Sequence, residues 1–98
     1  MSAPSEIIVF SNDVEISRHA LAPGEHTIGR ASAASIPITL GPVSREHARL
    51  RVSESGAVQV EDLTSANGTL LDEIAVSDLT LWTPKQTLRI GDVTLRAS

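Results

Sequence analysis

The 98-residue sequence contains no cysteine and no tyrosine, and its aromatic side chains are limited to Trp82 and Phe10. Without cysteine it has no disulfide, no catalytic thiolate and no Cys-ligated zinc. Nucleic-acid binding proteins that stack bases need exposed aromatic rings, which are scarce here. Basic residues are also few, 8 against 12 acidic ones, for a net charge of −4. This balance argues against broad binding to DNA, RNA or anionic membranes.

Long hydrophobic runs are missing as well. No stretch approaches the roughly 18 apolar residues of a membrane-spanning helix, and residues 1–6 have neither a positive leader nor an apolar core for a signal peptide. We therefore expect a cytoplasmic location, which the lack of cysteine also fits. The length predicts one domain over residues 1–98.

Alternating apolar and polar residues predict short β-strands along almost the whole chain, and no helix. Ala48, Leu50 and Val52 share one strand face, while Arg49 and Arg51 share the exposed face. The expected strands cover residues 7–10, 14–21, 26–29, 36–40, 47–52, 58–60, 69–71, 74–76, 79–82, 87–90 and 93–96. Ten or eleven short strands indicate an all-β protein with two packed antiparallel sheets.

Individual residues also predict the positions of hairpin turns, of a sheet-edge strand and of core side chains. Asn12-Asp13 and Gly91-Asp92 are typical of tight hairpin turns. Pro37 cannot donate to a strand ladder, which predicts an edge strand or a strand start there. We assign Trp82 and Phe10 to the core.

Three short polar segments lie between the expected strands. They are Gly29-Arg30, Ser44-Arg45-Glu46-His47 and Ser65-Ala66-Asn67-Gly68-Thr69. A sheet scaffold can gather such loops at one end of a domain. Together they would offer guanidinium groups, hydroxyls, a carboxamide and backbone N–H groups, which is the chemistry of a phosphate-binding surface.

The order and spacing of these segments resemble the forkhead-associated (FHA) domain. Thr27-Ile28 and Leu88-x-x-Gly91-Asp92 also fit the family pattern, and the resemblance covers about residues 6 to 97. It implies an eleven-stranded antiparallel β-sandwich of the FHA/SMAD-like type, with its functional loops at one end. It also implies binding of phosphothreonine in a partner protein that a Ser/Thr kinase has modified. No cofactor, metal, nucleic acid or membrane is implied.

The family pattern assigns roles to individual residues. Arg30 matches the arginine that contacts the phosphate, Ser44 a hydroxyl that hydrogen-bonds it, and Arg45 a second, more variable contact. Asn67 matches the asparagine that holds the peptide backbone. Residues that match loop-shaping positions are Gly29, His47 and Gly68.

Two positions depart from the family pattern. Ala66 stands where the family often has Thr or Ser, so a hydroxyl donor is missing unless Ser65 or a water replaces it. We therefore include Ser65 among the expected phosphopeptide-binding residues. Asp72-Glu73 stand where the family tends to have an Asn-Gly turn. Their negative charge would oppose phosphate binding if they faced the site.

Other functions are open to the same residues. Ser44, His47 and Asp62 are the residue types of a hydrolase triad, but Ser44 lacks a nucleophile-elbow pattern, and we expect no enzyme activity. The spacings of His19, His26 and His47 match no standard metal site. The main alternative is an interaction module of the same fold that binds an unmodified partner, which Ala66 and the net negative charge would suit.

Overall fold

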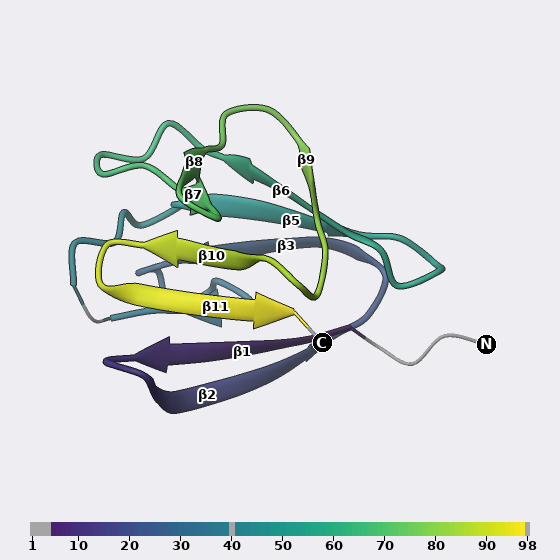
Figure 1. The fold of residues 1–98 in the computed structure, drawn as a ribbon, viewed down its shortest axis with the longest axis horizontal. Helices are drawn as coiled ribbons and strands as arrows, with labels where there is room; N and C mark the ends of the chain where they lie inside the picture. The colour runs from purple at the N-terminus through teal and green to yellow at the C-terminus, as the bar shows by residue number, and fades with distance from the viewer. Residues whose placement is uncertain (1–4, 40, 98) are drawn as a thin grey trace.

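The computed structural model of the chain describes residues 5–39 and 41–97, and these form an all-β fold (Figure 1). The described residues contain eleven strands and no helix, as the alternation predicts. The strands are β1 (Ser5–Ser11), β2 (Val14–Leu21), β3 (Gly24–Gly29), β4 (Ile36–Pro37), β5 (Ala48–Val52), β6 (Val58–Asp62), β7 (Leu70–Leu71), β8 (Ile74–Ala75), β9 (Thr80–Trp82), β10 (Thr87–Ile90) and β11 (Val93–Ala97).

The strands form two sheets that pack face to face. One has six strands in the order β2-β1-β11-β10-β7-β8, and the other has five in the order β4-β3-β5-β6-β9 (Figure 1). The expected sandwich is thus confirmed. All pairs are antiparallel except β3 and β4, where Ile28 lies opposite Ile36 in a short parallel pair. β4 ends its sheet, as Pro37 predicts.

Strand alternation fills the space between the sheets. Ala48, Leu50 and Val52 of β5 are buried, and Trp82 is 1% exposed with its indole Nε1–H donating to the Gln86 carbonyl oxygen at 3.0 Å. The core assignment of Trp82 is therefore confirmed.

The core assignment of Phe10 is wrong. Ile7 and Val9 are the inward residues of β1, so Phe10 lies on the outer face of the sheet, where it is half-buried. The pairing of β1 with β2 also shifts register between Val9 and Phe10.

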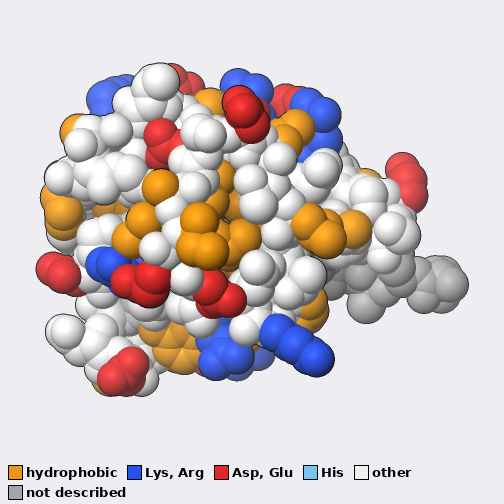
Figure 2. All heavy atoms as spheres, turned by 45° about the horizontal axis from the view of Figure 1, so that its top comes forward, with side chains coloured by type: hydrophobic (Ala, Val, Ile, Leu, Met, Phe, Trp, Pro, Cys, Tyr) orange, Lys and Arg blue, Asp and Glu red, His pale blue; other side chains and the backbone are white. Residues whose placement is uncertain are grey.

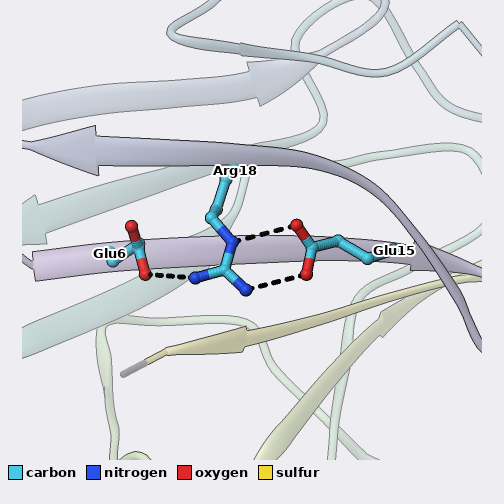
Figure 3. Close-up of polar contacts among 3 residues, drawn as sticks. All are labelled: Glu6, Glu15 and Arg18. Carbon is cyan, nitrogen blue, oxygen red and sulfur yellow. Dashed lines mark hydrogen bonds and ion pairs between the residues drawn. The ribbon is translucent and has the colours of Figure 1, made fainter.

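The register shift places Glu15 and Arg18 together on the outer face of β2 (Figure 3). Arg18 donates two hydrogen bonds to Glu15, at 2.9 and 2.8 Å, and one to Glu6 at 3.0 Å. The hydrogen bonds from Arg18 lower the pKa of Glu15. All three side chains are exposed, so the cluster adds little stability, but it neutralises the Arg18 charge.

Several turns lie together at one end of the sandwich (Figure 1). Asn12 and Asp13 have φ values of 51° and 64°, and Gly91 has a φ of 60°, so both predicted hairpin turns are confirmed. The loops that follow β3, β4 and β6 reach the same end. In the part of the chain that the structure describes, no helix has the length and hydrophobicity needed to span a bilayer.

Candidate functional site

The loops that follow β3 and β4 are joined by backbone hydrogen bonds. The Arg30 N–H donates to the Ser44 carbonyl at 3.0 Å, and the Ala31 N–H donates to the Arg45 carbonyl at 3.2 Å. Gly29 makes this approach possible. A Cβ atom at position 29 would lie 2.0 Å from the Arg45 carbonyl oxygen, well inside van der Waals contact. Two of the three polar segments therefore meet because residue 29 has no side chain.

His47 joins the second segment to the third. Its ring is fully buried, and Nδ1 accepts a hydrogen bond from the Ser44 N–H at 3.1 Å. Because Nδ1 is an acceptor, the ring is neutral and its proton lies on Nε2. Nε2–H donates to the Gly68 carbonyl at 2.8 Å. Both ring nitrogens thus brace loop backbone.

Asp62, at the end of β6, organises the segment from residue 65 to 69. Its carboxylate accepts hydrogen bonds from the Ser65 N–H at 3.0 Å, from the Ser65 hydroxyl at 2.5 Å and from the Thr69 hydroxyl at 2.7 Å. Burial alone would raise the pKa of Asp62, but the hydrogen bonds from Ser65 and Thr69 outweigh it and hold the pKa below its ordinary value. The ionised carboxylate therefore stabilises this loop.

Arg30 extends along the loop that follows β4. Its Nε donates to the Val43 carbonyl at 3.2 Å and one Nη2 hydrogen to the Gly41 carbonyl at 2.9 Å. The guanidinium is exposed, and within residues 5–39 and 41–97 nothing bonds to its Nη1. Its remaining N–H groups have no acceptor among the described residues and are available to an anion.

Ser44 lies within the same loop, and Asn67 contacts that loop from the segment that follows β6. Asn67 donates from Nδ2 to the Pro42 carbonyl at 3.1 Å, which leaves its side-chain oxygen to accept from a ligand N–H. The Ser44 hydroxyl oxygen accepts from the Ala66 N–H at 3.1 Å. Its hydrogen has no acceptor among the described residues and is free to donate. Arg30, Ser44 and Asn67 thus converge around residues 41–44.

Arg45 and Ser65 have different surroundings. The Arg45 side chain is exposed and has no polar partner in the described chain. The Ser65 hydroxyl donates to Asp62 and accepts from the Gly68 N–H at 2.9 Å. Its hydrogen is thus already bonded within the loop. To replace the hydroxyl that Ala66 lacks, Ser65 would have to give up its bond to Asp62. Gly68 has a φ of 82°, which a residue without Cβ adopts freely.

Most arginines on the sheet strands are ion-paired, whereas the two arginines of the candidate loops are not. Within residues 5–39 and 41–97, the arginines with a carboxylate partner are Arg18, Arg49, Arg51 and Arg89. Arg30 and Arg45 have none among the described residues. Figure 2 shows basic side chains along the upper and lower edges of the face in view, with acidic side chains beside several of them. Arg96 of β11 also has no ion-pair partner among the described residues, so unpaired positive charge is not confined to these loops. Arg30 and Arg45 nevertheless place such charge there, although the chain as a whole is negative.

The Asp72-Glu73 turn does not oppose this charge. Both residues have positive φ, 49° and 67°, in a two-residue turn between β7 and β8. Glu73 accepts two hydrogen bonds from Arg89, at 2.9 and 2.7 Å, which lower the Glu73 pKa. Asp72 accepts from the Thr87 N–H at 2.9 Å. Asp72 is thus held at the start of β10, and the Glu73 charge is paired with Arg89.

Family and structure comparisons agree with this geometry. The family model described as the FHA domain matches residues 26–94, well over half of the chain. The chain belongs to the FHA domain family. A comparison with curated proteins gave no match.

Solved structures resemble the whole FHA domain. The FHA domain of the CT664 protein from Chlamydia trachomatis is 20% identical with a TM-score of 0.87, over 97% of this chain and 96% of that one. A structure from an analysis of phosphothreonine-dependent FHA domain interactions is 21% identical with a TM-score of 0.84, over 96% and 94%. Mycobacterium tuberculosis EmbR in complex with a low-affinity phosphopeptide is 19% identical with a TM-score of 0.84, over 100% of this chain and 25% of that one. At these identities the likeness shows the fold alone.

The residues of the hydrolase and metal alternatives are engaged elsewhere. Because both His47 nitrogens bond to backbone, no ring nitrogen is left to take a proton from Ser44. His19 contacts the Ser17 hydroxyl, and His26 contacts Ser35 and the Ala22 carbonyl. No three potential metal ligands come together within the described part of this FHA domain.

Sequence reasoning missed two supports of the site. The first is Asp62, which the sequence suggested only as a member of a hydrolase triad, although an Asp three residues before a Ser is a common local turn pattern. The second is Pro42, which packs against Gly91 of the β10–β11 turn. No local signal indicates that contact, since it joins loops from different sheets.

Proposed function

We propose that this FHA domain binds a phosphothreonine-containing segment of a partner protein. The observation that carries the proposal is the convergence of Arg30, Ser44 and Asn67 around one loop, with unpaired donors on the first two. A phosphorylated threonine carries about −1.5 to −2 charges at pH 7 and three strong acceptor oxygens. Guanidinium and hydroxyl donors match that group.

The proposed contacts divide into two kinds. Arg30 and the Ser44 hydroxyl donate to phosphate oxygens, with Arg45 adding positive charge beside them. Asn67, which contacts the Pro42 carbonyl, hydrogen-bonds the peptide backbone next to the phosphorylated residue. Gly29, His47 and Gly68 hold the loops in place. Ser65 supports the loop through its hydrogen bonds with Asp62 and Gly68. Its hydroxyl would have to rotate away from Asp62 to contact the ligand directly.

The contacts give an affinity suited to reversible binding. A hydrogen bond to a charged group contributes roughly 1.5–3 kcal/mol. Two or three of these, with the Asn67 contact, are consistent with a dissociation constant on the order of micromolar. The function is that of a non-enzymatic interaction module that acts after a Ser/Thr kinase, in the cytoplasm.

A phosphopeptide library tests the proposal. Degenerate phosphothreonine peptides are screened on the purified domain, and the best sequence is then titrated with and without its phosphate. We expect micromolar binding of the phosphorylated peptide and at least about tenfold weaker binding of its twin, since the charged hydrogen bonds disappear. Equal affinities would reject phosphate recognition and favour a module that binds unmodified protein.

A further inference from the structure

The loop between β4 and β5 is held by an unusual set of side-chain donors. Three consecutive carbonyl groups, those of Gly41, Pro42 and Val43, accept from Arg30 Nη2, Asn67 Nδ2 and Arg30 Nε in turn. The two side chains that would contact a ligand therefore take their positions from the same short backbone segment. Any movement of that segment moves both.

Pro42 lies at the centre of this segment and shapes it. The Val43 N–H donates to the Gly41 carbonyl at 3.0 Å, which closes a three-residue γ-turn around Pro42. An inverse γ-turn needs a central φ near −75°, close to the value that a proline ring imposes. Pro42 therefore sets the directions of the three carbonyls before any ligand binds.

The Pro42 ring rests on a turn of the opposite sheet. A Cβ atom on Gly91 would lie 3.1 Å from both Cδ and Cγ of Pro42, so the ring covers the glycine directly. Figure 1 shows the β10–β11 turn beside the loop that follows β4. Gly91 also has a φ of 60°, and the turn is fixed by the pairing of Ile90 with Val93.

We propose that Gly91 is a positioning residue for ligand recognition, acting through Pro42 on the spacing between Arg30 and Asn67. The inference rests on the proposed function, but it assigns a role to a residue of the β10–β11 turn, which contributes no contact to the ligand. A side chain at position 91 displaces the Pro42 ring. The three carbonyls follow it, and the guanidinium and the carboxamide lose their common support.

The test compares Gly91→Ala with Gly24→Ala. Gly24 also has a positive φ, 132°, but a Cβ there meets no atom within 4 Å. Both variants strain the backbone and lower stability. We expect Gly91→Ala to weaken binding of the selected phosphothreonine peptide about fivefold, within the range of coupling between contacting residues, and Gly24→Ala to leave binding unchanged. Equal effects of the two variants would overturn the proposal.

A double-mutant cycle separates positioning from general damage. Pro42→Ala removes the ring atoms that a residue-91 side chain would meet. In that background the additional effect of Gly91→Ala on binding should fall below about twofold, because contacting residues couple non-additively. Additive losses would show that Gly91 does not act through Pro42.

A measurement without ligand distinguishes this proposal from the proposed function. NMR signals of the Arg30 Nε–H and the Asn67 side-chain amide should shift in Gly91→Ala and stay in place in Gly24→Ala. If they shift but no phosphopeptide binds the wild-type domain, the positioning role stands and phosphate recognition fails. Unmoved signals in Gly91→Ala would overturn the positioning role.

Discussion

Gly29 and the Arg45 carbonyl lie so close together that no other residue fits at position 29. The backbone of β3 lies so close to the loop before β5 that even a methyl group does not fit between them. A Cβ atom at position 29 would lie 2.0 Å from the Arg45 carbonyl oxygen. The neighbouring hydrogen bonds, from Arg30 to Ser44 and from Ala31 to Arg45, depend on that approach. The candidate loops are thus fixed by backbone contact.

We expect Gly29→Ala to destabilise the domain by about 3 kcal/mol, since the added methyl group overpacks a site bounded by backbone. Urea unfolding measures the change. In Gly41→Ala the new Cβ meets no atom, so only the left-handed conformation at a φ of 70° adds a cost, of about 1–2 kcal/mol. A Gly29→Ala variant as stable as Gly41→Ala would contradict the close approach.

His47→Ala should lower stability by about 3 kcal/mol. The change leaves a cavity and removes the partners of the Ser44 N–H and the Gly68 carbonyl. His19→Ala is the matched control, because His19 is half-buried and its ring hydrogen-bonds only the Ser17 hydroxyl among the described residues. Thermal unfolding of the two variants compares them. Similar losses would show that the His47 ring does not hold the loops.

Asp62 gives the stability of the domain a defined pH dependence. Its folded-state pKa lies below the unfolded value of about 3.9. Its contribution is therefore fully present above that value and is lost as pH falls through the folded pKa. We expect the stability difference between wild type and Asp62→Asn to be largest near pH 7 and to shrink below about pH 4. Urea titrations over this range measure it, and a constant difference would be inconsistent with the assigned role.

Ala66→Thr tests the missing hydroxyl. Ala66 is exposed, and its N–H donates to the Ser44 hydroxyl oxygen, so a side chain at this position lies next to a proposed phosphate contact. An added donor should strengthen phosphopeptide binding by roughly 1 kcal/mol. Calorimetric titration measures the gain, with the unphosphorylated peptide as control. An equal gain for both peptides would mean that the hydroxyl does not reach the phosphate.

The sequence predicts the fold well because most strands alternate cleanly. The apolar positions of β5 fix which face is buried, and short turn signals such as Asn12-Asp13 fix where strands end. Phe10 shows the limit of this reasoning. Its hydrophobicity suggests the core, but the phase of β1 is set by Ile7 and Val9, and Phe10 falls on the outer face.

The residues of the candidate site could be predicted from sequence motifs, but the contacts that hold them in place could not. The three polar segments name the residues that converge, through their resemblance to a family. Their supports depend on contacts that only the folded chain creates, such as Pro42 against Gly91 and His47 against Gly68. The effects of Ala66 and of the Asp72-Glu73 turn on phosphate binding also depend on where these residues lie in the fold, which the sequence does not show.

Titration of Arg30→Ala with the selected phosphothreonine peptide tests the central claim most directly. Arg51→Ala is the matched control, because Arg51 is exposed and paired with Glu25 on the outer face of β5. We expect Arg30→Ala to lose roughly 2–3 kcal/mol of binding free energy, from the charged hydrogen bonds removed, with the fold intact and Arg51→Ala binding like wild type. Wild-type affinity in Arg30→Ala would contradict phosphate recognition by these loops.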